Sequence, residues 1–324
     1  MRILFAGNPA IAIPSLHALS EMECNGQDVQ IAGVLTNPDS VQGRKAVLVP
    51  TDVSAAATDL SEKRLQNGFP PIVQLKHEKI TKQVREEISE LKCDLLVCFA
   101  LGCIFGPKCL SLFSMGGINM HPSLLPRYRG PSPIPAVILG GDKETGVTIQ
   151  RIALEMDAGD ILAQEKIPLD GKETTASLSG IAAAVAAKML PSVINGLMAG
   201  TVNTMPQTGE PVLSELITRE HGHIDWKLDA IKIDAMVRAY FPWPLCHTSR
   251  GTEDLYILEG CVIKSEKTDA QAGTVLGIDR DKGILVQTGD GVYAVSVLQR
   301  QAKKAMDWKS FLNGARDFIG SRLE

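Results

Sequence analysis

The sequence predicts a two-domain protein, with a doubly wound α/β domain first and a small β-barrel domain second. Three observations support this fold class. The chain has 324 residues, about twice the usual length of one domain. As far as about residue 205, apolar runs alternate with helical patterns, which is typical of a parallel sheet. Beyond that point the apolar runs are short and separated by glycine and aspartate turns, as in barrels.

The first part is expected to alternate strands with helices. Apolar or β-branched runs predict strands at 2–7, 28–36, 71–74, 94–100, 116–121 and 145–153. Apolar residues at helical spacing predict helices at 14–22, 79–92 and 134–141, and an alanine-rich run predicts one at 174–198. Pro191 is expected to interrupt or kink the last helix, because proline lacks the N–H of a helical hydrogen bond.

The second part is expected to begin after a turn-rich link at 205–212. A helix is predicted at 228–240, where apolar residues share one face. Short strands are predicted at 254–266, 273–278, 283–289 and 291–299. A closing helix is predicted at 306–319.

The composition argues against several classes of protein. The seven cysteines are odd in number and contain no Cys-x-x-Cys pair, which argues against a disulfide framework or a zinc site and favours the cytoplasm. No run approaches the ~18 uninterrupted apolar residues of a membrane span, so no membrane partner is expected. The net charge of −4 argues against non-specific coating of nucleic acid, although a local basic patch stays open.

Asn119 and His121 close the strand predicted at 116–121. Ligands of doubly wound sheets gather at the carboxyl ends of the strands. Residues two apart on a strand point to the same side, so one pocket can receive both side chains. An asparagine amide can donate to an oxyanion, and a histidine can hold a proton near neutral pH. Two interpretations stay open: a catalytic pair, or an asparagine that caps a turn beside a histidine satisfied in a loop.

Asp157 follows the strand predicted at 145–153. A carboxylate beside a histidine can orient the ring and relay a proton, although the same Asp-Gly sequence also suits an ordinary turn between strands. The proline-rich loop at 123–133 could offer main-chain groups to a flat heterocycle, and Arg127 and Arg129 could meet carboxylate or phosphate. It could also be only a stiff connection.

Five stretches of the chain carry a family resemblance: FAGNP, INMHPSLLPRYRG, ETGVTIQRIALEMDAGDIL, IDWKLDAIKIDAMVRAYFPWP and GTVLGI with GILVQTGDGVYAVSVLQRQAKKAM. Together they resemble the methionyl-tRNA formyltransferase family along nearly the whole chain. The family pattern is Asn-x-His, then Ser-Leu-Leu-Pro, then an aspartate 36 residues beyond the histidine. The resemblance implies that Asn119, His121 and Asp157 are catalytic. It also implies a folate-binding loop, made of Ser123, Leu124, Leu125 and Pro126.

The resemblance implies the domain plan and the macromolecular contacts as well. Residues 1–205 are expected to form a Rossmann-like formyltransferase domain, and 206–324 an OB-like β-barrel domain that contributes to tRNA binding. The loop at 36–50 is expected to enter the acceptor end of the tRNA, although its basic residues are only Arg44 and Lys45. The segment from 300 to 316 has five basic residues against one acid, so Arg300, Lys303 and Lys304 are expected to contact tRNA. A solvated helix face would show the same charge pattern.

The implied activity is formyl transfer from 10-formyltetrahydrofolate to the methionine of initiator Met-tRNA, by a cytoplasmic monomer without a metal. Asn119 and a protonated His121 would stabilise the oxyanion, and Asp157 would hold the imidazole. Two alternatives stay open. One is a folate-dependent formyltransferase that acts on a small amine, such as glycinamide ribonucleotide or an amino sugar nucleotide. The other is a non-catalytic RNA-binding protein that uses the barrel alone.

Overall fold

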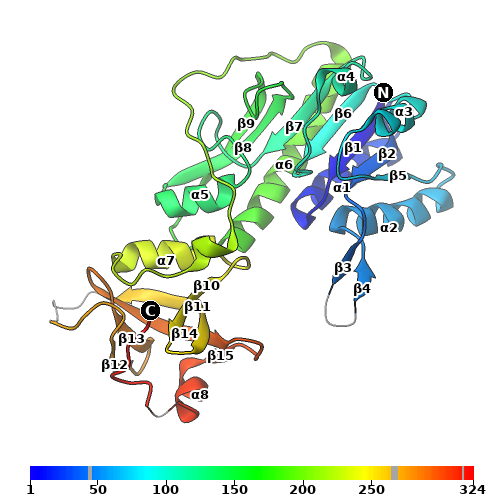
Figure 1. Cartoon of the computed structure of the whole chain (residues 1–324). Coiled ribbons are helices and arrows are strands. Elements are labelled where there is room, and N and C mark those ends of the chain that lie inside the picture. The colour runs from blue at the N-terminus through cyan, green and yellow to red at the C-terminus, as the bar shows by residue number, and fades with distance from the viewer. Residues whose placement is uncertain (43–45, 264–268, 316) are drawn as a thin grey trace. The chain divides into compact units, whose positions relative to one another are not determined.

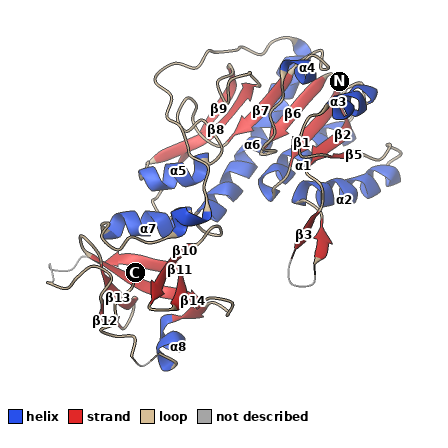
Figure 2. Ribbon diagram, viewed as in Figure 1, coloured by secondary structure: helices blue, strands red, loops and turns tan. Residues whose placement is uncertain are grey.

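The computed structural model describes residues 1–42, 46–263, 269–315 and 317–324 (Figure 1). The chain forms two compact units, an α/β unit and a unit rich in antiparallel strands (Figure 2). The first unit contains Met1–Pro133, Glu144–Pro168 and Ser179–Ser214. The second contains Ile134–Lys143, Leu169–Leu178 and Glu215–Glu324.

A seven-stranded sheet forms the centre of the first unit, in the order β5-β2-β1-β6-β7-β8-β9. The strands are β1 (Arg2–Gly7), β2 (Gln30–Thr36), β5 (Val73–Lys76), β6 (Leu95–Phe99), β7 (Gly117–His121), β8 (Glu144–Arg151) and β9 (Ile161–Pro168). From β5 to β7 all neighbours are parallel, which confirms the predicted doubly wound sheet. β8 lies at the strand predicted at 145–153, whereas β9 was not predicted, and both strands pair antiparallel with their neighbours. A short turn between them permits only antiparallel pairing.

Helices of the first unit include α1 (Ile13–Cys24), α2 (Asp52–Gln66), α3 (Lys82–Glu90) and the short α4 (Pro107–Leu110). The sequence did not predict α2. Its N-terminus is capped by Thr51, whose hydroxyl accepts from the Ser54 amide at 3.1 Å. Its buried face relies partly on Ala56 and Ala57, which give a weak hydrophobic pattern.

The helix α6 (Thr175–Ala199) runs through Pro191 as one element, so the predicted interruption is wrong. Buried side chains recur on one face of α6, at Ala182, Ala186, Leu190, Val193 and Leu197. Packing of this face holds the helix together across the proline. By length and composition α6 could also cross a membrane, although 44% of its most apolar 18-residue stretch is buried inside the protein. The core helices of soluble proteins pass the same test.

The predicted 36–50 loop contains a two-stranded hairpin of β3 (Ser40–Gln42) and β4 (Val47–Val49). The hairpin stands out from the sheet of the first unit (Figure 1). Val41, Val47 and Leu48 expose more than half of their surface. Arg44 and Lys45 lie outside the described residues.

The second unit is built on an antiparallel sheet of order β10-β11-β14-β13-β12, with β15 beside β14. The strands are β10 (Cys246–Arg250), β11 (Glu253–Ile263), β12 (Val275–Asp279), β13 (Gly283–Gln287), β14 (Val292–Arg300) and β15 (Met306–Asp307). The expected second domain of short β-strands is confirmed as one with an antiparallel sheet, although β10 was not predicted. The helices are α5 (Pro133–Gly140), α7 (Ala230–Ala239) and α8 (Trp308–Asn313), which is shorter than the closing helix predicted at 306–319.

Candidate active site

The candidate site lies at the carboxyl ends of the parallel strands in the first unit. The side chain of Asn8, just after β1, ties two neighbouring strand ends together. Its Nδ2 donates to the Leu101 carbonyl beyond β6 at 2.7 Å, and its Oδ1 accepts from the Asn37 amide beyond β2 at 2.8 Å. The next strand, β7, ends in Asn119 and His121. The strand order therefore places this pair at the edge of the sheet where such folds bind ligands.

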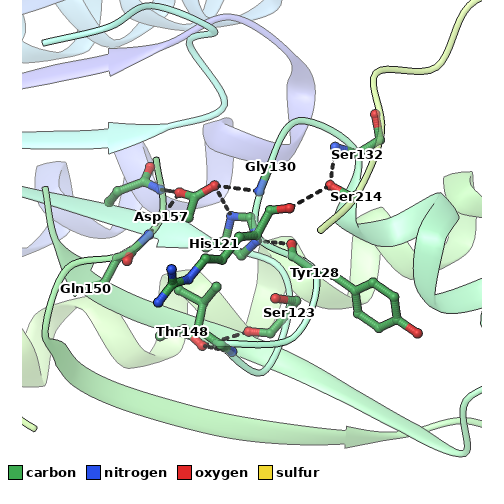
Figure 3. Close-up of polar contacts among 12 residues, drawn as sticks. His121, Ser123, Tyr128, Gly130, Ser132, Thr148, Gln150, Asp157 and Ser214 are labelled. Carbon is green, nitrogen blue, oxygen red and sulfur yellow. Dashed lines mark hydrogen bonds and ion pairs between the residues drawn. The ribbon is translucent and has the colours of Figure 1, made fainter. Parts of the chain in front are cut away.

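The structure brings together the three side chains expected to be catalytic, Asn119, His121 and Asp157. Figure 3 shows His121 and Asp157 facing each other. Asn119 Nδ2 donates to Asp157 Oδ1 at 3.3 Å, and His121 Nδ1 lies 3.5 Å from Asp157 Oδ2. His121 is buried, whereas the Asp157 side chain keeps 13% of its surface exposed. Asp157 is therefore the member of the group that connects the buried histidine with the solvent side of the site.

The Asp157 carboxylate is held by donors from three parts of the first unit. Besides Asn119, Gln150 Nε2 donates to Oδ1 at 2.9 Å, and the Gly130 main-chain amide donates to Oδ2 at 2.9 Å. The φ angle of Asp157 is +52°, in the left-handed region that L-residues rarely occupy. This backbone geometry costs free energy, so the surrounding contacts must hold Asp157 in place.

Burial favours the neutral form of the His121 ring. Its Nε2 lies 2.8 Å from the Tyr128 carbonyl oxygen, and a carbonyl only accepts, so Nε2 carries the proton. Burial lowers the pKa of His121 below its ordinary value, although the Asp157 carboxylate and the Tyr128 carbonyl act in the opposite direction. The lone pair of Nδ1 then faces Asp157. The protonated His121 expected during the reaction stays a prediction.

The Ser123–Pro126 segment is fixed by hydrogen bonds within the protein. Ser123 Oγ donates to the Arg127 carbonyl at 2.6 Å, and the Ser123 carbonyl accepts from Thr148 Oγ1 at 2.7 Å. The Leu125 amide donates to Thr148, and its carbonyl accepts from Gln164. Ser123 and Leu125 are buried, whereas Leu124 and Pro126 are half-buried. Most of the main-chain groups that were expected to face a ligand thus form hydrogen bonds within the protein, and these bonds fix the shape of the loop.

Two glutamines of the site were missed by the sequence analysis. Gln150 is the cross-strand partner of Asn119 on β8, and Gln207 contacts the main chain at Asp157. Neither belongs to a motif with a fixed spacing. The pairing of β7 with β8 could have pointed to Gln150, whereas Gln207 comes from a distant segment that only the folded chain brings close.

Comparison with known proteins identifies both parts of the chain. Residues 1–194 match the family described as "Formyl transferase", and residues 216–316 match "Formyl transferase, C-terminal domain". The chain is 42% identical over 330 residues to a protein named methionyl-tRNA formyltransferase from Treponema denticola, with both chains fully covered. It is 40% identical to the protein of that name from Treponema pallidum, covering 100% of this chain and 99% of the relative. The chain belongs to the methionyl-tRNA formyltransferase family.

A solved structure supports the fold of this formyltransferase. HypX from Aquifex aeolicus, in complex with tetrahydrofolic acid, matches with a TM-score of 0.64 at 17% identity. The match covers 98% of this chain and 48% of the HypX chain. At this identity the likeness concerns the arrangement of the chain alone.

The residues of the formyltransferase expected to contact tRNA differ in their surroundings. The guanidinium of Arg300 pairs with Glu253 at 2.5 Å and lies 4.4 Å from the ring centroid of Phe311. Lys303 and Lys304 are exposed on the turn after β14. Arg300 is thus engaged within the second unit, whereas the two lysines extend into solvent.

Within the described residues of the formyltransferase, no cluster of three or more His, Cys, Asp or Glu side chains is arranged to hold a metal ion. Cys98 lies beneath the site, paired with Asn119 across β6 and β7. Burial raises the pKa of its thiol to about 12. This cysteine is therefore a protonated packing residue at neutral pH.

Proposed function

We propose that this enzyme transfers the formyl group of 10-formyltetrahydrofolate to the α-amino group of methionine on initiator Met-tRNA. The observation that carries the proposal is the convergence of Asn119, His121 and Asp157 at one strand edge, in a chain 42% identical to a named methionyl-tRNA formyltransferase. The alternatives are a formyltransferase for a small amine and a non-catalytic RNA-binding protein. Similarity over the full length to a protein named methionyl-tRNA formyltransferase favours neither of these alternatives.

The reaction requires an oxyanion donor and a proton carrier. The amine attacks the formyl carbon, and the carbonyl oxygen becomes an oxyanion in the tetrahedral intermediate. Asn119 uses one amide hydrogen toward Asp157, which leaves its second hydrogen for this oxygen. The carboxylate of Asp157, backed by neutral His121, accepts the proton of the attacking amine. As the bond between the formyl carbon and the folate nitrogen breaks, that proton passes to the folate nitrogen.

Folate binding is proposed at the Ser123–Pro126 loop. Buried Ser123 and Leu125 hold the loop in shape through Thr148. The half-buried side chains of Leu124 and Pro126 are then left to contact the co-substrate. Their apolar surface suits a flat heterocycle.

The tRNA contacts are proposed at the 36–50 hairpin and at the turn that carries Lys303 and Lys304. The hairpin offers exposed apolar side chains, and Arg44 and Lys45 stand between its two strands in the sequence. The two turn lysines offer charge to phosphate. Because the whole chain has a net charge of −4, this attraction must be local. We also propose that the enzyme works in the cytoplasm, as a monomer, without a metal or a membrane partner.

Formyl transfer to three acceptors tests the proposal. Purified enzyme is supplied with 10-formyltetrahydrofolate and with initiator Met-tRNA, glycinamide ribonucleotide or an amino sugar nucleotide, with unacylated tRNA as control. We expect formylation of Met-tRNA alone, and its loss in Asp157→Asn. Transfer to a small amine in preference to Met-tRNA would establish the first alternative. Tight tRNA binding without any transfer would establish the second.

A further inference from the structure

Residues 205–214 cross the two loops that build the candidate site, and we call this segment the clamp. At its start, Met205 and Ile161 exchange two main-chain hydrogen bonds, of 2.8 and 2.9 Å. Ile161 begins β9, directly after the turn that carries Asp157. The start of the clamp is therefore fixed by hydrogen bonds to the residue that follows the turn.

The far end of the clamp is attached to the loop after Pro126. The Arg129 amide donates to the Val212 carbonyl at 2.9 Å, and the Ser214 amide donates to the Arg129 carbonyl at 2.7 Å. Ser214 Oγ also accepts from the Ser132 amide at 3.1 Å (Figure 3). This loop supplies the Gly130 amide that holds the Asp157 carboxylate, so the clamp touches both sides of the site.

The side chain of Gln207 lies between these two attachments. Its Oε1 accepts from Nε and Nη2 of Arg129, at 3.0 and 2.9 Å. Its Nε2 lies 2.8 Å from both the Asp157 and Gly159 carbonyls and 3.2 Å from Gln150 Oε1. The amide cannot be turned around, because its NH₂ would then face the guanidinium and its oxygen would face three acceptors.

This fixed amide sets the orientation of the next one. Gln150 Oε1 accepts from Gln207, so Gln150 Nε2 must face Asp157 Oδ1, where it donates at 2.9 Å. Asp157 then presents its other oxygen to His121. Gln207 also holds the main chain at Asp157, whose φ of +52° requires support from its surroundings. One glutamine thus controls both the backbone and the side chain of the proposed proton acceptor.

We propose that Gln207 is a positioning residue for formyl transfer, which acts by holding Asp157 toward His121 and Asn119. This inference rests on the proposed function. Glutamine is required because the position needs an acceptor toward Arg129 and a donor toward two main-chain carbonyls. Methionine supplies neither, and glutamate supplies only the acceptor.

Gln207→Met and Gln207→Glu separate positioning from folding. We expect Gln207→Met to lower kcat about 10-fold to 100-fold with KM for both substrates nearly unchanged, as for a displaced catalytic group. Gln207→Glu keeps the Arg129 contact and adds a negative charge that raises the pKa of His121. Its kcat/KM should therefore begin to fall at a higher pH than that of the wild type. Unchanged kcat and an unchanged pH profile in both variants would overturn the inference.

Gln74→Met is the matched control, because Gln74 also makes two side-chain hydrogen bonds in the first unit, with Ser54 and Thr58 on α2. It should keep the wild-type kcat, and an equal loss of kcat there would overturn the inference by showing a general effect. NMR titration of His121 gives a readout without activity, and its pKa should rise in Gln207→Glu. If wild-type enzyme formylates no Met-tRNA, the proposed function fails, whereas an unshifted His121 titration overturns the role of Gln207 alone.

Discussion

At the scale of single residues, the proposed mechanism separates the donor of a hydrogen bond from the carrier of a proton. Asn119 is half-buried and has one amide hydrogen to spare, whereas both ring nitrogens of His121 face protein atoms. In the proposed mechanism the histidine therefore acts on the reaction through Asp157. This division of roles makes different predictions for the two side chains.

Asn119→Ala should remove the oxyanion donor. Loss of one such donor commonly lowers kcat by roughly 10²-fold to 10³-fold, and KM should change much less. Steady-state rates with Met-tRNA and 10-formyltetrahydrofolate measure both quantities. Asn67→Ala, at the exposed end of α2, is a control that should keep both. A near-normal kcat for Asn119→Ala would remove this residue from the mechanism.

The pH dependence should reflect neutral His121. Burial lowers the pKa of His121 below 6.5, so the ring stays neutral near pH 7 and becomes protonated only on acidification. A protonated ring pairs with Asp157 and weakens it as a proton acceptor. We expect kcat/KM to fall on the acid side, with a midpoint below 6.5. A loss of kcat/KM on raising the pH through 6.5 to 8 would instead show that the imidazolium is the active form.

At the scale of elements, the turn between β8 and β9 leaves no room for a side chain at position 159. A Cβ atom on Gly159 would lie 1.8 Å from the Arg151 carbonyl oxygen, which belongs to the backbone and cannot rotate away. Gly159→Ala must therefore shift the turn that presents Asp157. The close approach explains why glycine follows Asp157 by two residues.

Gly159→Ala should lower both stability and activity. Overpacking of this kind costs about 1–3 kcal/mol of unfolding free energy, and the displaced Asp157 should lower kcat as well. Urea unfolding and steady-state kinetics measure the two effects. Gly180→Ala is the control, because its Cβ meets nothing within 4 Å and alanine favours the helix α6. Wild-type values for Gly159→Ala would contradict the tight turn.

Elements with strong local patterns were predictable from the sequence. β1 and β6 are apolar on both faces, as in a covered parallel sheet, and their positions were predicted within one or two residues. α2, β9 and β10 were missed, because alanine-rich or mixed polar faces give weak periodicity. Asn119, His121 and Asp157 could be found by spacing. Gln207 could not, since its role depends on a contact across 50 residues of sequence.

At the scale of the whole molecule, tRNA affinity should depend on few charges. Lys303 and Lys304 are exposed, and each phosphate contact adds about one unit to the salt dependence of binding. Lys303→Ala with Lys304→Ala should weaken tRNA binding and lower that slope by about 1 to 2, with KM for the folate unchanged.

Titration of tRNA binding over a range of salt concentrations measures the slope. Arg300→Ala is an informative comparison, because Arg300 pairs with Glu253 and stacks on Phe311. Arg300→Ala should mainly lower the free energy of unfolding of the second unit. Its effect on the salt dependence of tRNA binding should be small. An unchanged slope in the double lysine variant would show that this turn does not touch phosphate.

The clamp is also the last part of the first unit to be synthesised. A nascent chain made as far as Ala199 already contains Asn119, His121 and Asp157, together with every strand of the first sheet. It still lacks Gln207 and the attachments at Met205 and Ser214. A chain released before residue 214 should therefore contain all three proposed catalytic side chains and still lack the support of Asp157.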